Sequence, residues 1–428
     1  MRVLVLGGYG FIGEAICRVL HVRGHAVTGL GRDVGRARAR MPFVRWIEGD
    51  IAGLASAEWA ALVTGFDAVV NAAGALQDGA RDDVAAVQDA AMRALYNAAA
   101  VQDRPPLIVQ ISANTAGAGA DTPFLATKRA ADNTLKASGL PHVILRPALV
   151  IGRNAHGGTA LVRALAGFPL VMPLMQTQSP VVTVALEDVA QCVADAVEGV
   201  IAPGSDLVLA ADERLTLKEC VAAHRAWLGL PSGRIVEVPG WAGKLAGMAA
   251  DLAGRLGWRS PLRSTALAVM GGGVEAGPGS RPERHLLPLN ETLMRMPAGA
   301  QDLWFARLYL LKPVLVLGLS AFWVASGSIA LLGFEASAQY MGFAGLPERL
   351  GRGLTLLTSL ADIALGAAVL WRVWAARALQ GMMVLSLAYL VAATILTPAL
   401  WLDPLGPLVK VVPSILLAAV TLAILDER

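Results

Sequence analysis

The sequence Gly7-Gly8-Tyr9-Gly10-Phe11-Ile12-Gly13 follows the apolar run Val3-Leu4-Val5-Leu6 and opens a helical pattern that continues to Arg23. Gly8, Gly10 and Gly13 fit the spacing GxGxxG, and Gly7, Gly10 and Gly13 fit GxxGxxG. In either register Gly10 lets the backbone approach a diphosphate, and Gly13 lets the helix pack closely on the strand. The free N–H groups at the start of such a helix attract phosphate. The stretch therefore predicts a nucleotide-binding turn, with a plain glycine-rich turn as the alternative in a chain of 45 glycines.

The composition divides the chain into two parts. Of its 428 residues, 55% are hydrophobic and 16% are charged, which is more apolar than an ordinary soluble enzyme. The excess begins at about Trp304, so we expect a soluble first part and a membrane last part. A net charge of +3 without a basic stripe argues against a nucleic-acid partner. Cys17, Cys192 and Cys220 form no CxxC pair, which argues against a disulfide framework or a metal site and favours a reducing cytoplasm.

The first part alternates strands and helices. Apolar runs at 26–30, 43–47, 67–71 and 107–111 are typical of buried strands, and residues 84–101 have a helical pattern. This alternation with short connections predicts an α/β fold, a doubly wound parallel sheet that binds its ligand at the carboxyl ends of the strands.

The end of the second predicted strand bears on the choice of cofactor. Arg32 lies at this end, where an arginine suits the 2′-phosphate of NADP and an acidic residue suits the free 2′-hydroxyl of NAD. Because Arg32 occupies this end and Arg36, Arg38 and Arg40 follow, NADP(H) is favoured over NAD(H). Asp33 keeps NAD open, and the run from Arg36 also fits a solvated helix face.

Other strand ends supply further candidates. Asp50, next to Ile51, follows the third strand, where a carboxylate could accept from the adenine amino group. The small residues Ala72-Ala73-Gly74 follow the fourth strand and leave room for a cofactor, and Ser112 follows the fifth.

The first 295 or so residues resemble the short-chain dehydrogenase/reductase superfamily, specifically its extended and atypical branches. The resemblance rests on the glycine turn, Gly49-Asp50-Ile51, Asn71-Ala72-Ala73-Gly74, Lys128 within the segment 127–132, and Arg146-Pro147-Ala148-Leu149-Val150-Ile151-Gly152. It implies a Rossmann fold, a nicotinamide cofactor and a small substrate lobe. The cofactor-binding residues that it implies together with the strand ends are Gly7, Gly8, Gly10, Phe11, Ile12, Gly13, Arg32, Asp50, Ile51, Ala72, Ala73, Gly74, Ser112, Lys128 and Pro147.

We expect short strands of the substrate lobe at 207–209 and 235–238. Glu187 and Asp188 are expected to cap the start of a helix, and Thr216 with Glu219 predicts a capping box.

One departure from the superfamily pattern bears on function. Its members usually carry Tyr-x-x-x-Lys, in which the tyrosine donates a proton and the lysine lowers the pKa of the tyrosine and holds the nicotinamide ribose. Here Phe124 replaces the tyrosine and Lys128 remains, so Lys128 is the one catalytic candidate. Ser112, Asn114, Thr127 and His156 are the nearest other polar residues by the superfamily layout, and Tyr96 is expected to pack in the core. Three explanations stay open: binding without turnover, an acceptor that needs no tyrosine, or another acid.

Four apolar segments, at 308–334, 350–374, 378–402 and 405–425, each reach the ~20 residues that a membrane helix needs. They predict an all-α four-helix transmembrane domain at 308–428 after a linker at 296–307, with the Rossmann domain with its substrate lobe at 1–295. With the Lys312-Pro313 entry, the arrangement resembles the DoxX-like four-helix membrane family. The basic residues of the connections favour a multi-pass protein of the inner membrane with a cytoplasmic Rossmann domain. Asp362 and Lys410 are ionisable candidates within these segments.

The sequence thus favours a membrane-anchored NADP(H)-dependent oxidoreductase, with the lipid bilayer as partner and a quinone, isoprenoid or lipid-like substrate. The alternative is a non-catalytic NADPH-binding scaffold or redox sensor, because the soluble part is also similar to the NADPH-binding accessory subunit of respiratory complex I. A sugar-nucleotide epimerase ranks last, because it depends on the missing tyrosine.

Overall fold

The computed structural model describes residues 1–426 except 75–82, 116–119, 265–266, 268–272 and 344. The contacts divide the chain into two compact units, each described by itself: Met1–Asp251 with Ser260–Ala306, and Leu252–Arg259 with Arg307–Arg428. The domain boundaries given above stay a prediction.

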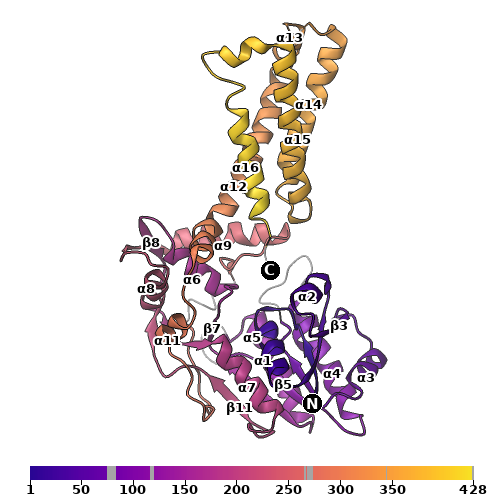
Figure 1. The fold of residues 1–428 in the computed structure, drawn as a ribbon, viewed down its shortest axis with the longest axis vertical. Helices are drawn as coiled ribbons and strands as arrows, with labels where there is room; N and C mark the ends of the chain where they lie inside the picture. The colour runs from indigo at the N-terminus through magenta and orange to yellow at the C-terminus, as the bar shows by residue number, and fades with distance from the viewer. Residues whose placement is uncertain (75–82, 116–119, 265–266, 268–272, 344, 427–428) are drawn as a thin grey trace. The chain divides into compact units, whose positions relative to one another are not determined.

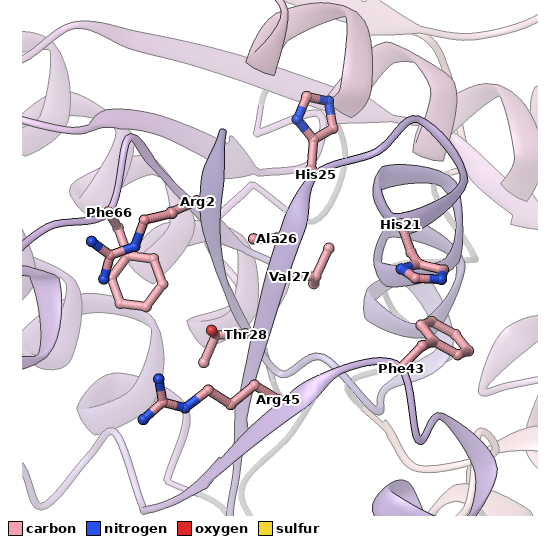
Figure 2. A pocket seen from close by; sticks show the side chains of 9 residues that line it. All are labelled: Arg2, His21, His25, Ala26, Val27, Thr28, Phe43, Arg45 and Phe66. Carbon is pink, nitrogen blue, oxygen red and sulfur yellow. The ribbon is translucent and has the colours of Figure 1, made fainter.

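The first unit contains a seven-stranded parallel sheet in the order β11-β6-β5-β4-β1-β2-β3. Figure 1 labels three of its strands, β3, β5 and β11. The order reverses between β1 and β4, which makes their carboxyl ends the switch point where such sheets bind ligands. The amino ends of β1, β2 and β3, at the opposite edge, border a hollow lined by residues that include Arg2, Thr28 and Arg45 (Figure 2). The strands are β1 (Arg2–Leu6), β2 (Ala26–Gly31), β3 (Arg45–Glu48), β4 (Ala68–Asn71), β5 (Leu107–Ile111), β6 (His142–Pro147) and β11 (Asp206–Leu209).

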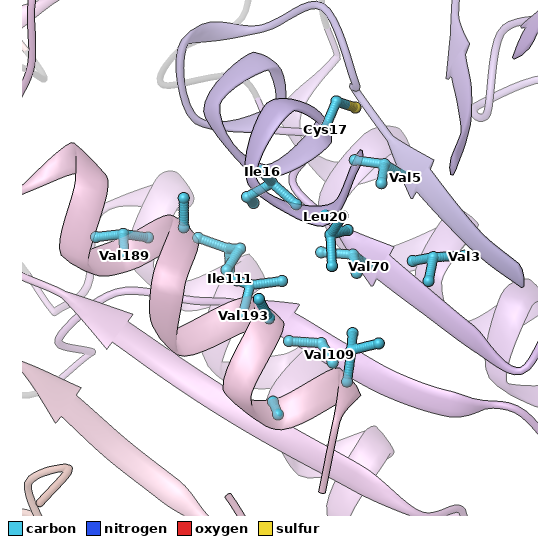
Figure 3. Close-up of a cluster of buried hydrophobic side chains, with 14 of the residues drawn as sticks. Val3, Val5, Ile16, Cys17, Leu20, Val70, Val109, Ile111, Val189 and Val193 are labelled. Carbon is cyan, nitrogen blue, oxygen red and sulfur yellow. The ribbon is translucent and has the colours of Figure 1, made fainter. Parts of the chain in front are cut away.

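Side chains alternate between the two faces of the sheet, as the pleat requires. In β1, Val3 and Val5 pack with α1 (Phe11–Val22) and α7 (Leu186–Val197), as Figure 3 shows. Leu4 and Leu6 join the second cluster, on the other face, with residues of the helices α3 (Ser56–Val63), α4 (Ala91–Ala100) and α5 (Pro123–Ala137). Two further helical segments beside this sheet are short, α2 (Gly35–Arg40) and a π-helical turn at Ala86–Ala90. The predicted doubly wound α/β fold is confirmed.

A smaller lobe is built from pairs of short strands. β7 (Leu149–Ile151) pairs with β10 (Thr183–Ala185), β9 (Pro180–Val181) with β12 (Leu215–Thr216), and β8 (Val171–Leu174) with β13 (Arg234–Glu237). A third core cluster lies here, with residues of α6 (Gly158–Ala166), α8 (Leu217–Trp227) and α11 (Leu289–Met294).

Two local predictions for this region are wrong and two are confirmed. The strand predicted at 235–238 is present as β13, one of the strands of the lobe. Residues 207–209 belong to β11, which pairs with β6 in the main sheet and not in the lobe. Asp188 does not cap α7, because its carboxylate binds another part of the chain: Oδ2 accepts from the Leu287 N–H at 2.8 Å. Glu187 does not cap it either, since the cap residue of α7 is Ala185. The Thr216 hydroxyl accepts from the Glu219 N–H at 3.2 Å, which confirms the capping box.

The second unit is helical. Its helices are α12 (Ala300–Leu332, whose first seven residues lie in the first unit), α13 (Phe334–Phe343), α14 (Glu348–Ala368), α15 (Arg372–Leu396) and α16 (Val411–Ala423), with a 3₁₀ turn at Pro398–Leu402. This confirms the predicted helical C-terminal region.

By length and composition, two helices in the described part of the chain, α12 and α15, can cross a membrane. α16 has 13 residues, fewer than the ~20 that a bilayer requires. The predicted segment 350–374 is divided, because α14 ends at Ala368 and α15 begins at Arg372. Four membrane passes therefore stay a prediction.

Candidate functional site

The glycine turn lies directly at the switch point. The Gly7 N–H donates to the Leu30 carbonyl at 3.0 Å, and the Gly10 N–H donates to the Gly7 carbonyl at 2.9 Å. Gly7 has a φ of +69°, and a Cβ there would lie 2.9 Å from the Ala73 Cα. The close approach of this turn to the end of β4 thus depends on a glycine at position 7.

Gly13 and Gly10 have different surroundings. A Cβ on Gly13 would lie 2.2 Å from the Gly7 oxygen, so the helix touches the turn at this point. A Cβ on Gly10 would meet only the Gly7 oxygen, at 3.1 Å, among the described atoms within 4 Å. Gly10 is also the cap residue of α1 and offers no side-chain cap. The start of α1 therefore fits a diphosphate, which would take the place of a capping side chain.

The neighbours of these glycines are held by packing. The Phe11 ring stacks on His156 with a centroid distance of 6.1 Å, and Ile12 packs against the core beneath α1. Gly8 lies close to Cys17, whose thiol donates to the Gly8 carbonyl at 3.6 Å. These contacts fix the direction in which α1 leaves the turn.

The end of β2 presents Arg32 as an exposed residue directly after Gly31. Asp33 is engaged locally, because its Oδ1 accepts from the Gly35 N–H at 3.4 Å. Arg40 donates to Glu14 Oε2 at 2.5 Å, so this end of the basic run holds α2 against α1. The role of Arg32 in choosing the cofactor stays a prediction.

Asp50 and Ile51 follow β3. Asp50 Oδ1 accepts from the Ala52 N–H at 3.1 Å, which closes an Asx turn. Ile51 is buried in the second core cluster. Asp50 is thus held by its hydrogen bond to Ala52, and Ile51 is held by its buried side chain.

Lys128 joins three elements of the site. It projects from α5 and is 7% exposed, and its Nζ donates to the Ile111 carbonyl at the end of β5 at 2.9 Å. A Cβ built on Gly74, just past β4, would lie 3.9 Å from the same Nζ. The structure therefore brings Lys128, the end of β5 and the small-residue end of β4 together. Burial lowers the pKa of Lys128 to about 8, with Asp132 opposing and Arg146 adding to the effect.

Phe124 occupies the aromatic position one helical turn before Lys128. The Lys128 Nζ lies 5.6 Å from the centroid of the Phe124 ring, in the range of a cation–π contact. The spacing of four residues has kept the aromatic ring beside the lysine, but phenylalanine has no hydroxyl to donate.

A partly buried ionic network adjoins Lys128, and sequence reasoning missed it. Ser112 Oγ donates to Asp132 Oδ2 at 2.5 Å, and Arg146 Nη1 lies 2.8 Å from the same oxygen. Arg146 Nε in turn donates to Asp206 Oδ1 at 2.6 Å. Burial raises the pKa of Asp132, and the hydrogen bond from Ser112 and the charge of Arg146 oppose the rise. Asp132 lies four residues after Lys128 on α5, and this spacing was an available signal that the two side chains lie on one face of the helix.

The other polar candidates have local roles. Thr127 Oγ1 donates to the Pro123 carbonyl at 2.8 Å, and Asn114 Nδ2 donates to the Glu275 carbonyl at 3.1 Å. Tyr96 is buried and donates to Gln110 Oε1 at 3.2 Å, as expected for a packing residue. Pro147 ends β6 opposite Leu209 of β11.

The second unit contains a buried carboxylate on α14. Tyr389 Oη donates to Asp362 Oδ1 at 2.9 Å, and Ser326 Oγ donates to Oδ2 at 3.2 Å. These contacts join α12, α14 and α15. Lys410 is exposed and precedes the first residue of α16.

Comparison with known proteins agrees with this geometry. Residues 7–199 match the family model described as NAD(P)H-binding, and residues 320–419 match the DoxX-like family. The chain therefore combines an NAD(P)-binding Rossmann domain with a C-terminal DoxX-like domain.

Individual relatives share parts of the chain. The human epimerase family protein SDR39U1 is 43% identical over 74 residues, which are 17% of this chain. The match spans about a fifth (20%) of the length of that relative.

Solved structures show the same fold over the first part. A candidate epimerase from Burkholderia cenocepacia J2315 is 20% identical with a TM-score of 0.51, over 72% of this chain and 98% of that chain. The Bordetella bronchiseptica enzyme WbmH, in complex with NAD⁺, is 21% identical with a TM-score of 0.50, over 72% of this chain and 98% of that chain.

Proposed function

We propose that this protein is a membrane-associated, NADP(H)-dependent oxidoreductase of the atypical short-chain dehydrogenase/reductase type. The observation that carries the proposal is the position of Lys128, whose Nζ lies 2.9 Å from the Ile111 carbonyl beside Gly74. A buried lysine beside the carboxyl ends of β4 and β5 would hold the nicotinamide ribose of a bound cofactor.

Each part of the cofactor has a candidate residue. The diphosphate would lie over Gly10 and the first N–H groups of α1, and the exposed Arg32 would pair with the 2′-phosphate. Asp50 would accept from adenine, and the small residues at 72–74 would leave room beside Lys128. When bound, the reduced nicotinamide supplies a hydride. The preference for NADP(H) over NAD(H) belongs to this proposal.

Lys128 is also our candidate for the acid that replaces the missing tyrosine. Its pKa of about 8 leaves the ammonium protonated at neutral pH and able to release a proton. As a substrate carbonyl is reduced, its oxygen would take the proton from Lys128 Nζ, and the amine would regain a proton from water. Phe124 would then act as a wall of the pocket beside the ammonium.

The substrate class is inferred from the second unit. A DoxX-like domain with two helices long and apolar enough to cross a membrane supports a substrate that dissolves in lipid. We propose a quinone, an isoprenoid or a lipid-like carbonyl compound, reached from the inner membrane by a Rossmann domain on the cytoplasmic face.

A second function is favoured by one observation, the phenylalanine at position 124. If Lys128 serves only the ribose, the protein is a non-catalytic NADPH-binding scaffold or redox sensor.

The test uses the full-length protein in nanodiscs with NADPH and, in parallel, a soluble ubiquinone analogue and a long-chain aldehyde. Loss of nicotinamide absorbance in proportion to protein with either acceptor supports the oxidoreductase. Tight NADPH binding without loss supports the scaffold. Absence of NADPH binding contradicts both functions.

A further inference from the structure

Helix α9 (Gly240–Arg255) has its small residues inside and its large apolar residues outside. Its buried face consists of Gly243, Gly247, Ala250 and Gly254. A Cβ on Gly243 would lie 2.1 Å from the Met175 sulfur, so this face is in direct contact with the first unit's own residues. The packing of α9 on the protein therefore leaves its large side chains without cover.

The uncovered side chains form one stripe. Trp241, Leu245, Met248 and Leu252 are 67%, 57%, 67% and 60% exposed. Their spacing of four, three and four residues places them on one line along the helix. Lys244 and Arg255 are exposed and lie along one edge of this stripe. A continuous exposed stripe of this kind marks an interaction surface.

The chain just beyond the stripe is fixed to the start of α15. Trp258 Nε1 donates to the Leu370 carbonyl at 2.6 Å, and the Arg372 N–H donates to the Leu256 carbonyl at 3.0 Å. The Arg372 guanidinium also lies 5.7 Å from the Trp258 ring. Residues 252–259 accordingly belong to the second unit, although the helix that leads to them is continuous from Gly240.

The start of α15 has the composition of a membrane–water boundary. Trp371 and Trp374 are exposed there, and the Arg377 guanidinium lies 5.3 Å from the Trp374 ring. Tryptophan and arginine gather at the ends of helices that cross a bilayer. A bilayer crossed by α15 would bring its headgroups to the level of Leu256 and Trp258, which are held at the start of this helix.

We infer that α9 is an interfacial helix that lies in the membrane surface, with Trp241, Leu245, Met248 and Leu252 inserted among the lipids. Lys244 and Arg255 would meet anionic headgroups, as basic residues do on helices that lie in this plane. Lipid is favoured over a second protein because the stripe continues into a segment held at the end of a candidate membrane helix. This inference does not depend on NADP(H) binding or on catalysis.

The test places an environment-sensitive NBD label at Leu245→Cys and, separately, at Met248→Cys in the full-length protein. Val200→Cys, which is exposed on the first unit, serves as the matched control. The natural cysteines Cys17, Cys192 and Cys220 are buried, so the introduced thiol is the accessible one. The labelled proteins are placed in nanodiscs of phosphatidylcholine with phosphatidylglycerol, with and without lipids that carry a nitroxide quencher on the acyl chain.

We expect at least twofold quenching of the labels at 245 and 248 and none of the label at 200. Equal quenching at all three positions, or none at any of them, would overturn the inference. A label at 245 that is shielded only at high protein concentration, without quenching by lipid, would instead assign the stripe to a second copy of the chain and would also overturn it. Two stripe positions keep the test decisive if one variant does not fold.

Discussion

Gly10 caps α1 and Gly13 lies in its first turn, and the two glycines are constrained by different neighbours. A Cβ at position 13 would lie 2.2 Å from the backbone oxygen of Gly7, which cannot move without the turn. We expect Gly13→Ala to lower the free energy of unfolding by about 1–3 kcal/mol, the usual cost of overpacking.

Gly10→Val should leave the helix content intact and abolish NADPH binding, because its side chain would fill the space proposed for the diphosphate. Circular dichroism and nicotinamide fluorescence measure the two effects, and NADPH binding by Gly10→Val at wild-type affinity would refute the site.

Arg32 carries the predicted preference for NADP(H). Arg32→Ala should weaken NADPH binding by about 1.5–3 kcal/mol, the range for a hydrogen bond to a charged group, and leave NADH binding unchanged. Arg104→Ala is the matched control, since Arg104 is also exposed and precedes the amino end of β5. Titration of wild type and the two variants with NADPH and with NADH measures both affinities. An equal loss for NADPH and NADH would assign Arg32 a structural role.

The proposed acid makes the rate dependent on pH. Burial lowers the pKa of Lys128 to about 8, so the protonated form that can donate is present below this value and is lost above it. The rate of NADPH oxidation should therefore fall about tenfold per pH unit above about pH 8. Lys128→Arg should keep ribose binding and lose most of the rate, because arginine does not release its proton in this range. A rate that is flat to pH 10 would exclude Lys128 as the acid.

At the scale of the elements, the buried carboxylate of α14 holds three helices together. Asp362→Ala would remove the acceptor for Tyr389 and Ser326 and should lower stability in detergent by about 0.5–2 kcal/mol, the range for polar contacts between membrane helices. Asp362→Asn keeps one acceptor oxygen and should lose less. Thermal unfolding of the two variants makes the comparison, and identical midpoints for wild type and Asp362→Ala would show that these contacts do not stabilise the bundle.

Strands could be predicted wherever burial on both faces produces an unbroken apolar run, as in β1. The order of the strands in the sheet could not be predicted, because the sequence does not show which strand pairs with β6. The chain passes through the small lobe and α7 before it returns as β11 beside β6. The same gap hid the link from Arg146 to Asp206, because Asp206 reaches Arg146 only when β11 is in place beside β6. The turn between α14 and α15 was missed for another reason: Val369-Leu370-Trp371 is itself apolar, so hydropathy shows no break there.

At the scale of the whole molecule, the chain joins an NAD(P)-binding sheet to a DoxX-like helical region. That the glycine turn, the ends of β4 and β5 and Lys128 lie together could be predicted, because a parallel sheet brings its carboxyl ends to one edge. Their binding of the cofactor stays a prediction. The number of membrane passes could not be predicted, since the length of an apolar segment does not by itself distinguish a helix that spans a membrane from one that is buried in the protein.

The most direct test of the proposed activity is a single turnover. Full-length protein in nanodiscs is loaded with less than one equivalent of NADPH, a soluble ubiquinone analogue is added, and the absorbance of the bound nicotinamide is followed, with Gly10→Val as the control. We expect wild type to oxidise its bound NADPH, and we expect the NADPH mixed with Gly10→Val to stay unbound and reduced. NADPH that stays bound and reduced on wild type, with this acceptor and with a long-chain aldehyde, would contradict the oxidoreductase and favour the scaffold.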